Sequence, residues 1–197
     1  MEDILAGGSL AAIGQALNER RLSVREAVGW YLKRIEALNY AGPCLNAVRE
    51  IAPDALDAAK RADDELAAGQ RRGPLHGIPV LVKDNILVAG MSATAGAAAL
   101  KSFKPGRDAT LAARLRAAGA IVIGKTNLTE FADYVSDVMP SGFSGAGGMV
   151  KNPHDVAPYG RGLGSSIGSA AATAVVPRTK SSPTRCGCRR RLASQSN

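Results

Sequence analysis

Gly77-Ile78-Pro79-Val80-Leu81-Val82-Lys83-Asp84-Asn85 is an apolar run that ends in a lysine. Its branched aliphatic residues are typical of a buried β-strand. Such a strand usually ends at a turn residue, because an ammonium group in an apolar interior is costly. Burial also lowers the pKa of a lysine, so a desolvated Lys83 could accept a proton near neutral pH. On the strand alone, a lysine that reaches back into water is the favoured interpretation.

The segments on the N-terminal side of this strand predict helices and one further strand. Ser23-Val24-Arg25-Glu26 is a capping box, so a helix is expected to begin there. A short strand is predicted over residues 46–51, and Pro53 is expected to open a helix that runs to about Ala68.

The segments on the C-terminal side continue the alternation. Asp108 is expected to cap a helix whose apolar side includes Leu111 and which Gly119 terminates. A buried strand is predicted over 120–123, a helix over 127–131, and a long loop over 136–168. Helices that alternate with short apolar strands indicate an α/β fold.

The charge of the chain is unevenly distributed. The net charge is +8, but the stretch from Pro177 onward holds 6 of the 25 basic residues and no acid, so the remainder carries 19 bases against 17 acids, or +2. We therefore divide the chain into a domain over 1–176 and a basic, disordered tail over 177–197. No apolar stretch is long enough to cross a bilayer, and the acidic start, Met1-Glu2-Asp3, is unlike a signal peptide. A cytoplasmic location without membrane contact is expected.

A glycine- and serine-rich turn precedes the last apolar stretch. Residues 162–169 read Gly-Leu-Gly-Ser-Ser-Ile-Gly-Ser and lead into an Ala- and Val-rich helix over 170–176. Glycines allow backbone conformations closed to other residues, so such a turn could hold a serine hydroxyl in a fixed pose beside free helix amides. A flexible loop before a helix explains the same residues equally well.

Three ordered segments resemble the amidase signature family. They are Gly73 to Asp84, Ala118 to Ala132, and Gly164 to Ala170, where the family usually has glycine at the place of Ile167. The resemblance runs from about Leu17 to Val176 and implies the N-terminal portion of that α/β fold, with a mixed β-sheet surrounded by helices.

The resemblance also implies a mechanism, hydrolysis of a carboxamide C–N bond by a Ser–cis-Ser–Lys triad. Lys83 matches the base, and Ser165 matches the bridging serine that follows a cis peptide bond. A hydroxyl between lysine and nucleophile relays the proton. A cis bond before a residue other than proline costs about 3–4 kcal/mol, so the fold must impose it. This chemistry uses a small-molecule amide as substrate and needs no metal and no cofactor.

The attacking serine of the family has no counterpart here. The alignment places Arg189 at its position, while Ser181 and Ser182 come too early and lack neighbouring glycines. The abrupt change after Val176 suggests a frame shift, altered splicing or a truncated gene. We therefore hypothesise an inactive amidase-family hydrolase, with exposed sheet edges that favour self-association. The alternative is a non-catalytic protein that binds a partner through its basic tail.

Other patterns favour different functions less strongly. Gly119-x-x-x-x-Gly124-Lys125-Thr126 matches the nucleotide-binding P-loop by letter, but a helix rather than a strand is predicted before Gly119. Asn127-Leu128-Thr129 fits a glycosylation acceptor, which should stay unmodified without a secretion signal. Cys186 and Cys188 lack a second pair of zinc ligands, and the tail has no aromatic residue for stacking on nucleic acid bases.

Overall fold

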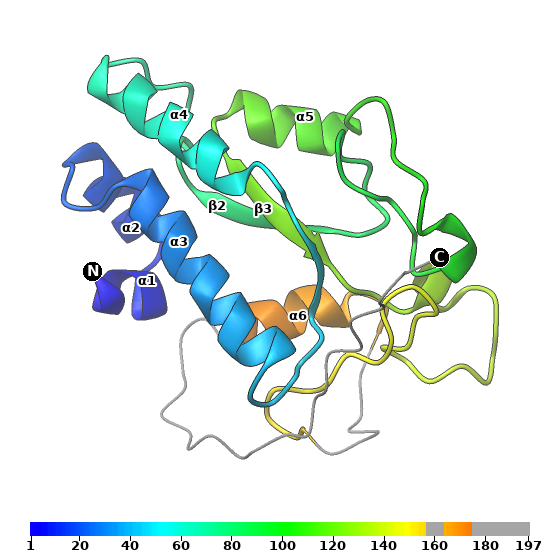
Figure 1. Ribbon diagram of the computed structural model, residues 1–197. Helices are drawn as coiled ribbons and strands as arrows, with labels where there is room; N and C mark the ends of the chain where they lie inside the picture. Colours follow the sequence, from blue (N-terminus) through cyan, green and yellow to red (C-terminus); the bar gives the residue numbers. More distant parts are fainter. Residues whose placement is uncertain (157–163, 175–197) are drawn as a thin grey trace, which may run out of the picture.

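The protein has a three-stranded mixed sheet with helices on both sides (Figure 1). The structure is a computed structural model that describes residues 1–156 and 164–174. The strands β1 (Val48–Ile51), β2 (Pro79–Lys83) and β3 (Ile121–Thr126) lie in the order β1-β3-β2. β2 runs parallel to β3, whereas β1 is antiparallel to it. The predicted α/β class with a mixed sheet surrounded by helices is confirmed.

Six α-helices surround this sheet. They are α1 (Glu2–Gly7), α2 (Leu10–Asn18), α3 (Val24–Ile35), α4 (Ala55–Ala67), α5 (Thr110–Ala117) and α6 (Ile167–Ala174), all within the described residues. A π-helical turn, η1 (Glu36–Tyr40), extends α3, and two 3₁₀ turns, η2 (Ala98–Leu100) and η3 (Glu130–Asp133), lie in the connections. Every strand and helix predicted up to Lys83 is present, with ends shifted by one or two residues.

The capping box at the start of α3 forms as predicted. The Ser23 hydroxyl accepts from the Glu26 amide, and the Glu26 carboxylate accepts from the Ser23 amide. The Asp63 carboxylate of α4 also accepts from the Val24 and Arg25 amides, at 2.7 and 3.0 Å. The first free amides of α3 are therefore satisfied from its own sequence and from α4, and this fastens the two helices together.

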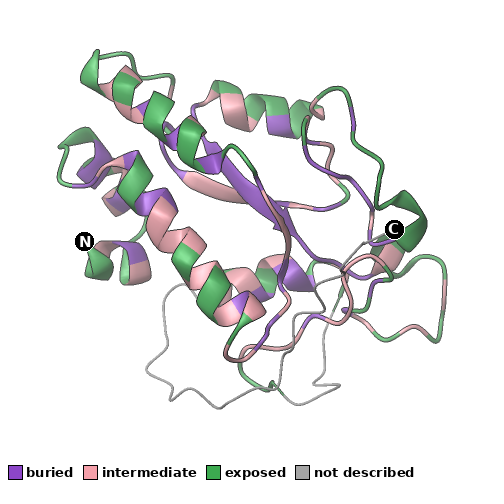
Figure 2. Ribbon diagram, viewed as in Figure 1, coloured by how far each residue is buried: buried purple, intermediate pink, exposed green. Residues whose placement is uncertain are grey.

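β3 is the centre of the core, and all six of its residues are buried. Figure 2 shows it as a continuous buried ribbon between the helices. α4 and α5 contact β3, and α6 contacts all three strands. Because side chains alternate along a strand, consecutive residues of β3 serve different faces of the sheet.

The prediction that Asp108 caps α5 is wrong. The N-cap of α5 is Ala109, without a side-chain cap. The Asp108 carboxylate instead accepts from the Ala89 amide at 2.7 Å and pairs with Arg116 at 3.2 Å. It therefore ties the loop after β2 to α5. Leu111 is also exposed, contrary to expectation, and the small Ala112 is the buried residue of this helix.

The helix predicted over 127–131 is also absent. Asn127 is fully buried, and its side-chain amide donates to carbonyls of Asn46, Gly147 and Gly148. Asparagine competes with helix formation through such bonds to the backbone, and here they join two segments distant in sequence. Only the turn η3 follows, and Phe131 inside it has a φ of 44°.

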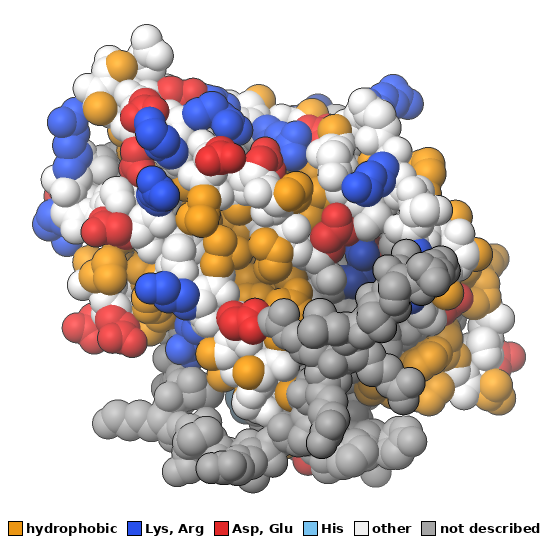
Figure 3. Space-filling model, in the orientation of Figure 1, with side chains coloured by type: hydrophobic (Ala, Val, Ile, Leu, Met, Phe, Trp, Pro, Cys, Tyr) orange, Lys and Arg blue, Asp and Glu red, His pale blue; other side chains and the backbone are white. Residues whose placement is uncertain are grey.

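A large part of the apolar surface is exposed. The phenylalanines Phe103, Phe131 and Phe143 are each at least 40% exposed, and Figure 3 shows apolar side chains in the middle and along one side of the face drawn. Within the described residues β2 pairs only with β3, which leaves its other edge without a strand. Self-association through this edge stays a prediction. No described helix has the length and apolar character needed to traverse a lipid bilayer.

Candidate active site

Lys83 and Ser165 meet, although 82 positions separate them in the sequence. Lys83 is the last residue of β2, and Ser165 lies in the turn just before α6. The Lys83 Nζ donates to the Ser165 Oγ at 3.1 Å. Both side chains are half-buried. The fold therefore brings together the two residues that the sequence singled out.

Burial is what perturbs the charge of Lys83. Desolvation at the end of β2 lowers the pKa of its ammonium group below the ordinary value of 10.5. A lower pKa makes the neutral amine, which can accept a proton, more populated at a given pH. The geometry and the direction of this shift are both those of a base next to a hydroxyl.

The peptide bond that precedes Ser165 is trans. No cis peptide bond occurs in residues 1–156 or 164–174, so the expected cis bond before Ser165 is not observed. Gly164 has a φ of 86°, a left-handed conformation that turns the chain sharply into the residues before α6. The Ser165 carbonyl then accepts from the Thr129 amide at 3.3 Å. A glycine turn and one backbone bond thus set the direction of the hydroxyl.

A hydrogen bond between two hydroxyls, those of Thr126 and Ser169, lies beside the Lys83–Ser165 contact. Thr126 of β3 is the register partner of Lys83, and its Oγ1 lies 2.8 Å from the Ser169 Oγ of α6. Between the two serines α6 approaches the sheet very closely, because a Cβ on Gly168 would lie 2.1 Å from the Asn127 carbonyl oxygen. Thr126 and Ser169 were not identified from the sequence, although the spacing of four between Ser165 and Ser169 was a usable signal.

A buried ionic cluster lies at the C-terminal ends of β2 and β3, on the face opposite to α6. Lys125 is fully buried, and its Nζ donates to the carbonyls of Asp84, Ile86 and Ser92, at 3.2, 2.7 and 3.2 Å. It also lies 3.8 Å from the Asp84 carboxylate. All three carbonyls belong to the segment that leaves β2 after Lys83, so Lys125 fixes the path of that segment. The lysine of the P-loop-like pattern is therefore engaged inside the protein and is not free to bind a phosphate.

Asp84 is the acidic centre of this cluster. Its carboxylate, fully buried, pairs with Arg49 at 2.6 Å and accepts from the amide and hydroxyl of Thr94. Arg49 also pairs with Glu50 at 2.7 Å. Two bases and two acids balance one another, which satisfies the rule that buried charges need partners.

Comparison with known proteins bears directly on this site. The sequence model of the family described as Amidase matches residues 26–177. The chain belongs to the amidase family.

Individual amidases and related proteins match over about a third of their own length. The chain is 40% identical over 170 residues to a glutamyl-tRNA(Gln) amidotransferase subunit from Bdellovibrio bacteriovorus, covering 86% of this chain and 33% of that protein. It resembles the crystal structure of peptide amidase from Stenotrophomonas maltophilia with a TM-score of 0.80 and 45% identity, over 84% of this chain and 34% of the other. An amidase family protein from Bacillus anthracis gives a TM-score of 0.80 at 37% identity, over 86% of this chain and 33% of the other.

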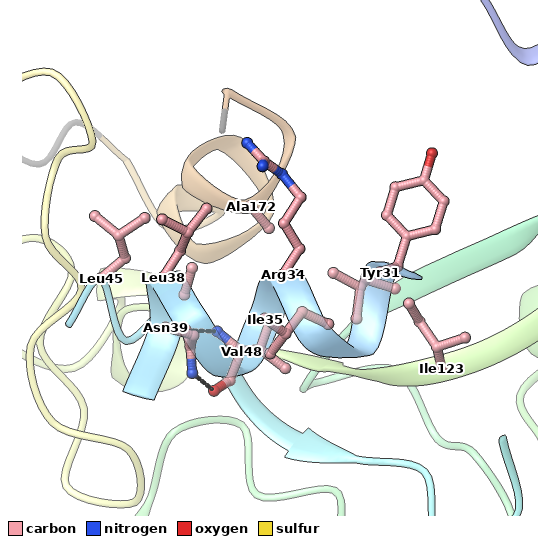
Figure 4. A pocket seen from close by; sticks show the side chains of 11 residues that line it. Tyr31, Arg34, Ile35, Leu38, Asn39, Leu45, Val48, Ile123 and Ala172 are labelled. Atoms are coloured by element: carbon pink, nitrogen blue, oxygen red, sulfur yellow. Dashed lines mark hydrogen bonds between the residues drawn. The ribbon is translucent and has the colours of Figure 1, made fainter. Parts of the chain in front are cut away.

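The pocket drawn in Figure 4 is distinct from the Lys83–Ser165 pair. It lies between α3, β1, β3 and α6, and neither Lys83 nor Ser165 lines it. Its walls are mainly aliphatic, including Leu38, Leu45 and Ile123. The Asn39 side chain at its edge is already bonded to both backbone polar groups of Val48. The polar groups of Asn39 therefore hold β1 against η1.

The described residues hold no metal site, and the candidate residues of the C-terminal stretch lie outside them. Among residues 1–156 and 164–174, no group of three His, Cys, Asp or Glu side chains could hold a metal ion. Cys186, Cys188, Arg189 and the serines at 181 and 182 lie outside the described residues, as does the whole basic tail.

Proposed function

We propose that Lys83 and Ser165 form the proton-transfer part of a site that hydrolyses a carboxamide C–N bond. The observation that carries this proposal is the 3.1 Å contact between the Lys83 Nζ and the Ser165 Oγ. It joins a lysine whose pKa is lowered by burial to a hydroxyl held in a glycine turn. Membership of the amidase family supports amide hydrolysis as the reaction.

The proton path follows from this contact. An attacking hydroxyl would give its proton to the Ser165 Oγ, and the Ser165 proton would pass to the neutral Lys83 amine. The attacking oxygen then bonds to the amide carbon, and the proton held by Lys83 is available to the leaving nitrogen. Lys83 must be neutral to begin this sequence, and burial promotes that state.

The substrate class we propose is a carboxamide without further specification. The names of the relatives indicate different substrates, glutamyl-tRNA(Gln) for one and a peptide for another. In the proposed site Lys83 and Ser165 would act on the carboxamide bond that is common to both. Nothing in this pair distinguishes between the acyl groups.

We further propose that this chain by itself does not turn over amides, because Arg189 stands where the family's attacking serine is aligned. An arginine side chain stays protonated and offers no nucleophile. Incubation of the purified chain with simple primary amides is expected to release no ammonia above the level of a Lys83→Ala variant. Ammonia release that Lys83→Ala abolishes would contradict the proposed inactivity. If no ammonia is released, the alternative of a non-catalytic protein that binds a partner through its basic tail stays open.

The chemical state of Lys83 can be measured without turnover. We expect acetylation of the Lys83 amine to titrate with a midpoint below 10.5, and Ser165→Ala to lower that midpoint by about one pH unit. The hydroxyl accepts a bond from the ammonium group, and a bond to a charged group contributes about 1.5 kcal/mol. Competitive labelling with acetic anhydride, read by peptide mass spectrometry over a pH series, gives both values.

The exposed Lys60 serves as an internal reference for reagent concentration in each sample. Thr173→Val, which removes an exposed hydroxyl from α6, is the matched control for loss of a hydroxyl. A Lys83 midpoint that is the same in the parent and Ser165→Ala would contradict the proposed pair.

A further inference from the structure

The hydroxyls of Thr126 and Ser169 lie next to the proposed pair without hydrogen bonding to either of its members. Thr126 stands opposite Lys83 in the β2–β3 ladder, and Ser169, in the first turn of α6, follows Ser165 by four residues. The contacts therefore form two parallel bridges between the sheet and the start of α6. Lys83–Ser165 is one bridge, at 3.1 Å, and Thr126–Ser169 is the other, at 2.8 Å.

The second bridge lies where the helix is closest to the sheet. Gly168 has no side chain, and the Asn127 and Ala47 carbonyl oxygens occupy the space where a Cβ would be. This close approach limits the distance between α6 and the sheet. Van der Waals contact at a residue without a side chain has little directional preference, so it does not set the rotation of the helix about its own axis. A directional hydrogen bond at the next residue, Ser169, does fix it.

We propose that Thr126 and Ser169 are positioning residues, whose mutual hydrogen bond sets the rotation of α6 and thereby holds the Ser165 hydroxyl at the Lys83 amine. This proposal rests on the proposed function of the Lys83–Ser165 pair. Thr126 suits the role because its β-branched side chain has few rotamers and so presents its hydroxyl in one direction. Ser169 suits it because it lies in the first turn of α6, four residues after Ser165, with its hydroxyl in contact with Thr126 of the sheet.

Lys125 and Thr126, adjacent in β3, contact the two segments that carry the members of the proposed pair. Lys125 binds the segment that follows Lys83, on one side of the strand ends, and Thr126 binds the helix that follows Ser165, on the other. Adjacent residues of a strand point to opposite faces, so one dipeptide reaches both partners of the pair. The Gly-Lys-Thr sequence that matches the P-loop pattern thus serves the assembly of this site.

The test is a double-mutant cycle on the acetylation midpoint of Lys83. Ser165→Ala is made in the parent chain and in Thr126→Val, Ser169→Ala and Thr126→Ser backgrounds. Thr126→Val keeps the shape and removes the hydroxyl, whereas Thr126→Ser keeps the hydroxyl and removes the methyl group. Thr173→Val is the control, because Thr173 is exposed and its hydroxyl donates to the Ser169 carbonyl within α6 rather than to a residue of the sheet. Circular dichroism confirms that each variant is folded.

In the parent and in Thr173→Val, Ser165→Ala is expected to shift the Lys83 midpoint by about one pH unit. In Thr126→Val and Ser169→Ala the same change is expected to shift it by less than about half a unit, because the serine has already moved away. Thr126→Ser is expected to restore the parent behaviour. A substitution that only destabilises the protein would not abolish the effect of Ser165→Ala on the Lys83 midpoint in the variants that remain folded.

Equal shifts in all backgrounds would overturn the positioning role while leaving the proposed pair intact. Absence of any shift in the parent chain would instead contradict the proposed function itself. If Thr126→Val does not fold, Ser169→Ala gives the same comparison from the helix side of the bond.

Discussion

Replacement of Lys125 with methionine is expected to lower the free energy of unfolding by about 3–5 kcal/mol, the usual cost of removing one partner from a buried ionic cluster. Methionine has a similar length, so the change leaves the packing volume nearly constant. It leaves three backbone carbonyls, those of Asp84, Ile86 and Ser92, without the donor that they share. It also leaves two acids, Asp84 and Glu50, with Arg49 as the base that contacts both.

Chemical denaturation of Lys125→Met beside Lys60→Met measures this difference. Lys60 is an exposed lysine in an i,i+4 pair with Asp64, and its loss is expected to cost less than about 0.5 kcal/mol. Each variant loses one lysine charge, so the difference between the two single variants reports the effect of burial. Equal unfolding free energies for the two variants would show that the cluster does not stabilise the fold.

The pH dependence of the same comparison has a definite sign. Burial lowers the pKa of Lys125 from 10.5 to about 8 in the folded protein. Between these values the unfolded chain binds more protons than the folded one, so this residue makes the protein more stable as the pH rises from about 8 to 10.5. Lys125→Met lacks this term, and its deficit relative to the parent is expected to grow over that interval. A constant deficit would mean that Lys125 keeps its proton throughout.

Replacement of Gly168 with alanine is expected to have the largest effect on the site. A Cβ there would lie 2.1 Å from the Asn127 carbonyl oxygen and 2.8 Å from that of Ala47, so α6 must move away from the sheet. Overpacking of this kind typically costs about 1–3 kcal/mol. Ser165 lies two residues before the start of α6 and is expected to move with it, so we also expect the Lys83 acetylation midpoint to become insensitive to Ser165→Ala.

Gly29→Ala is the matched control for this substitution. Gly29 lies inside α3, and nothing comes within 4 Å of the place where its Cβ would be. Alanine is the better helix former, so this variant is expected to be more stable than the parent by about 0.5–1 kcal/mol. Thermal unfolding of the two variants should give shifts of opposite sign. A stabilising effect of Gly168→Ala would show that α6 does not pack closely on the sheet.

The sequence predicted the regular elements well where a single local cause sets them. The capping box at Ser23 and the apolar run over 77–83 each place one element, because the signal and its structural effect lie within a few residues. The errors occurred at Asp108 and Asn127, two polar residues that commonly start helices. In both cases the side chain binds a segment far away in sequence, at Ala89 or at Asn46, and these contacts were not visible locally.

The candidate site shows the same division. Lys83 and Ser165 were found because their surroundings, a strand that ends in a lysine and a glycine-rich turn, resemble the segments of a family in order and spacing. The contributions of Lys125, Thr126 and Ser169 depend on which side of a strand or helix faces which neighbour. A shift of one residue in the β2–β3 register would exchange the roles of Lys125 and Thr126.

By itself the sequence determined the class of fold, the order of its strands and helices along the chain, and the two residues of the proposed pair. The elements could be predicted because propensity, capping and apolar periodicity act between residues that are neighbours in the chain, whereas the pair was identified from the resemblance of its two segments to those of a family. Only the tertiary structure decided that an ammonium group and a hydroxyl 82 positions apart lie 3.1 Å from one another, and that the lysine beside Thr126 is buried among carbonyls. Strand register and the placement of α6 on the sheet set these distances, and both depend on contacts between segments that are far apart in the sequence.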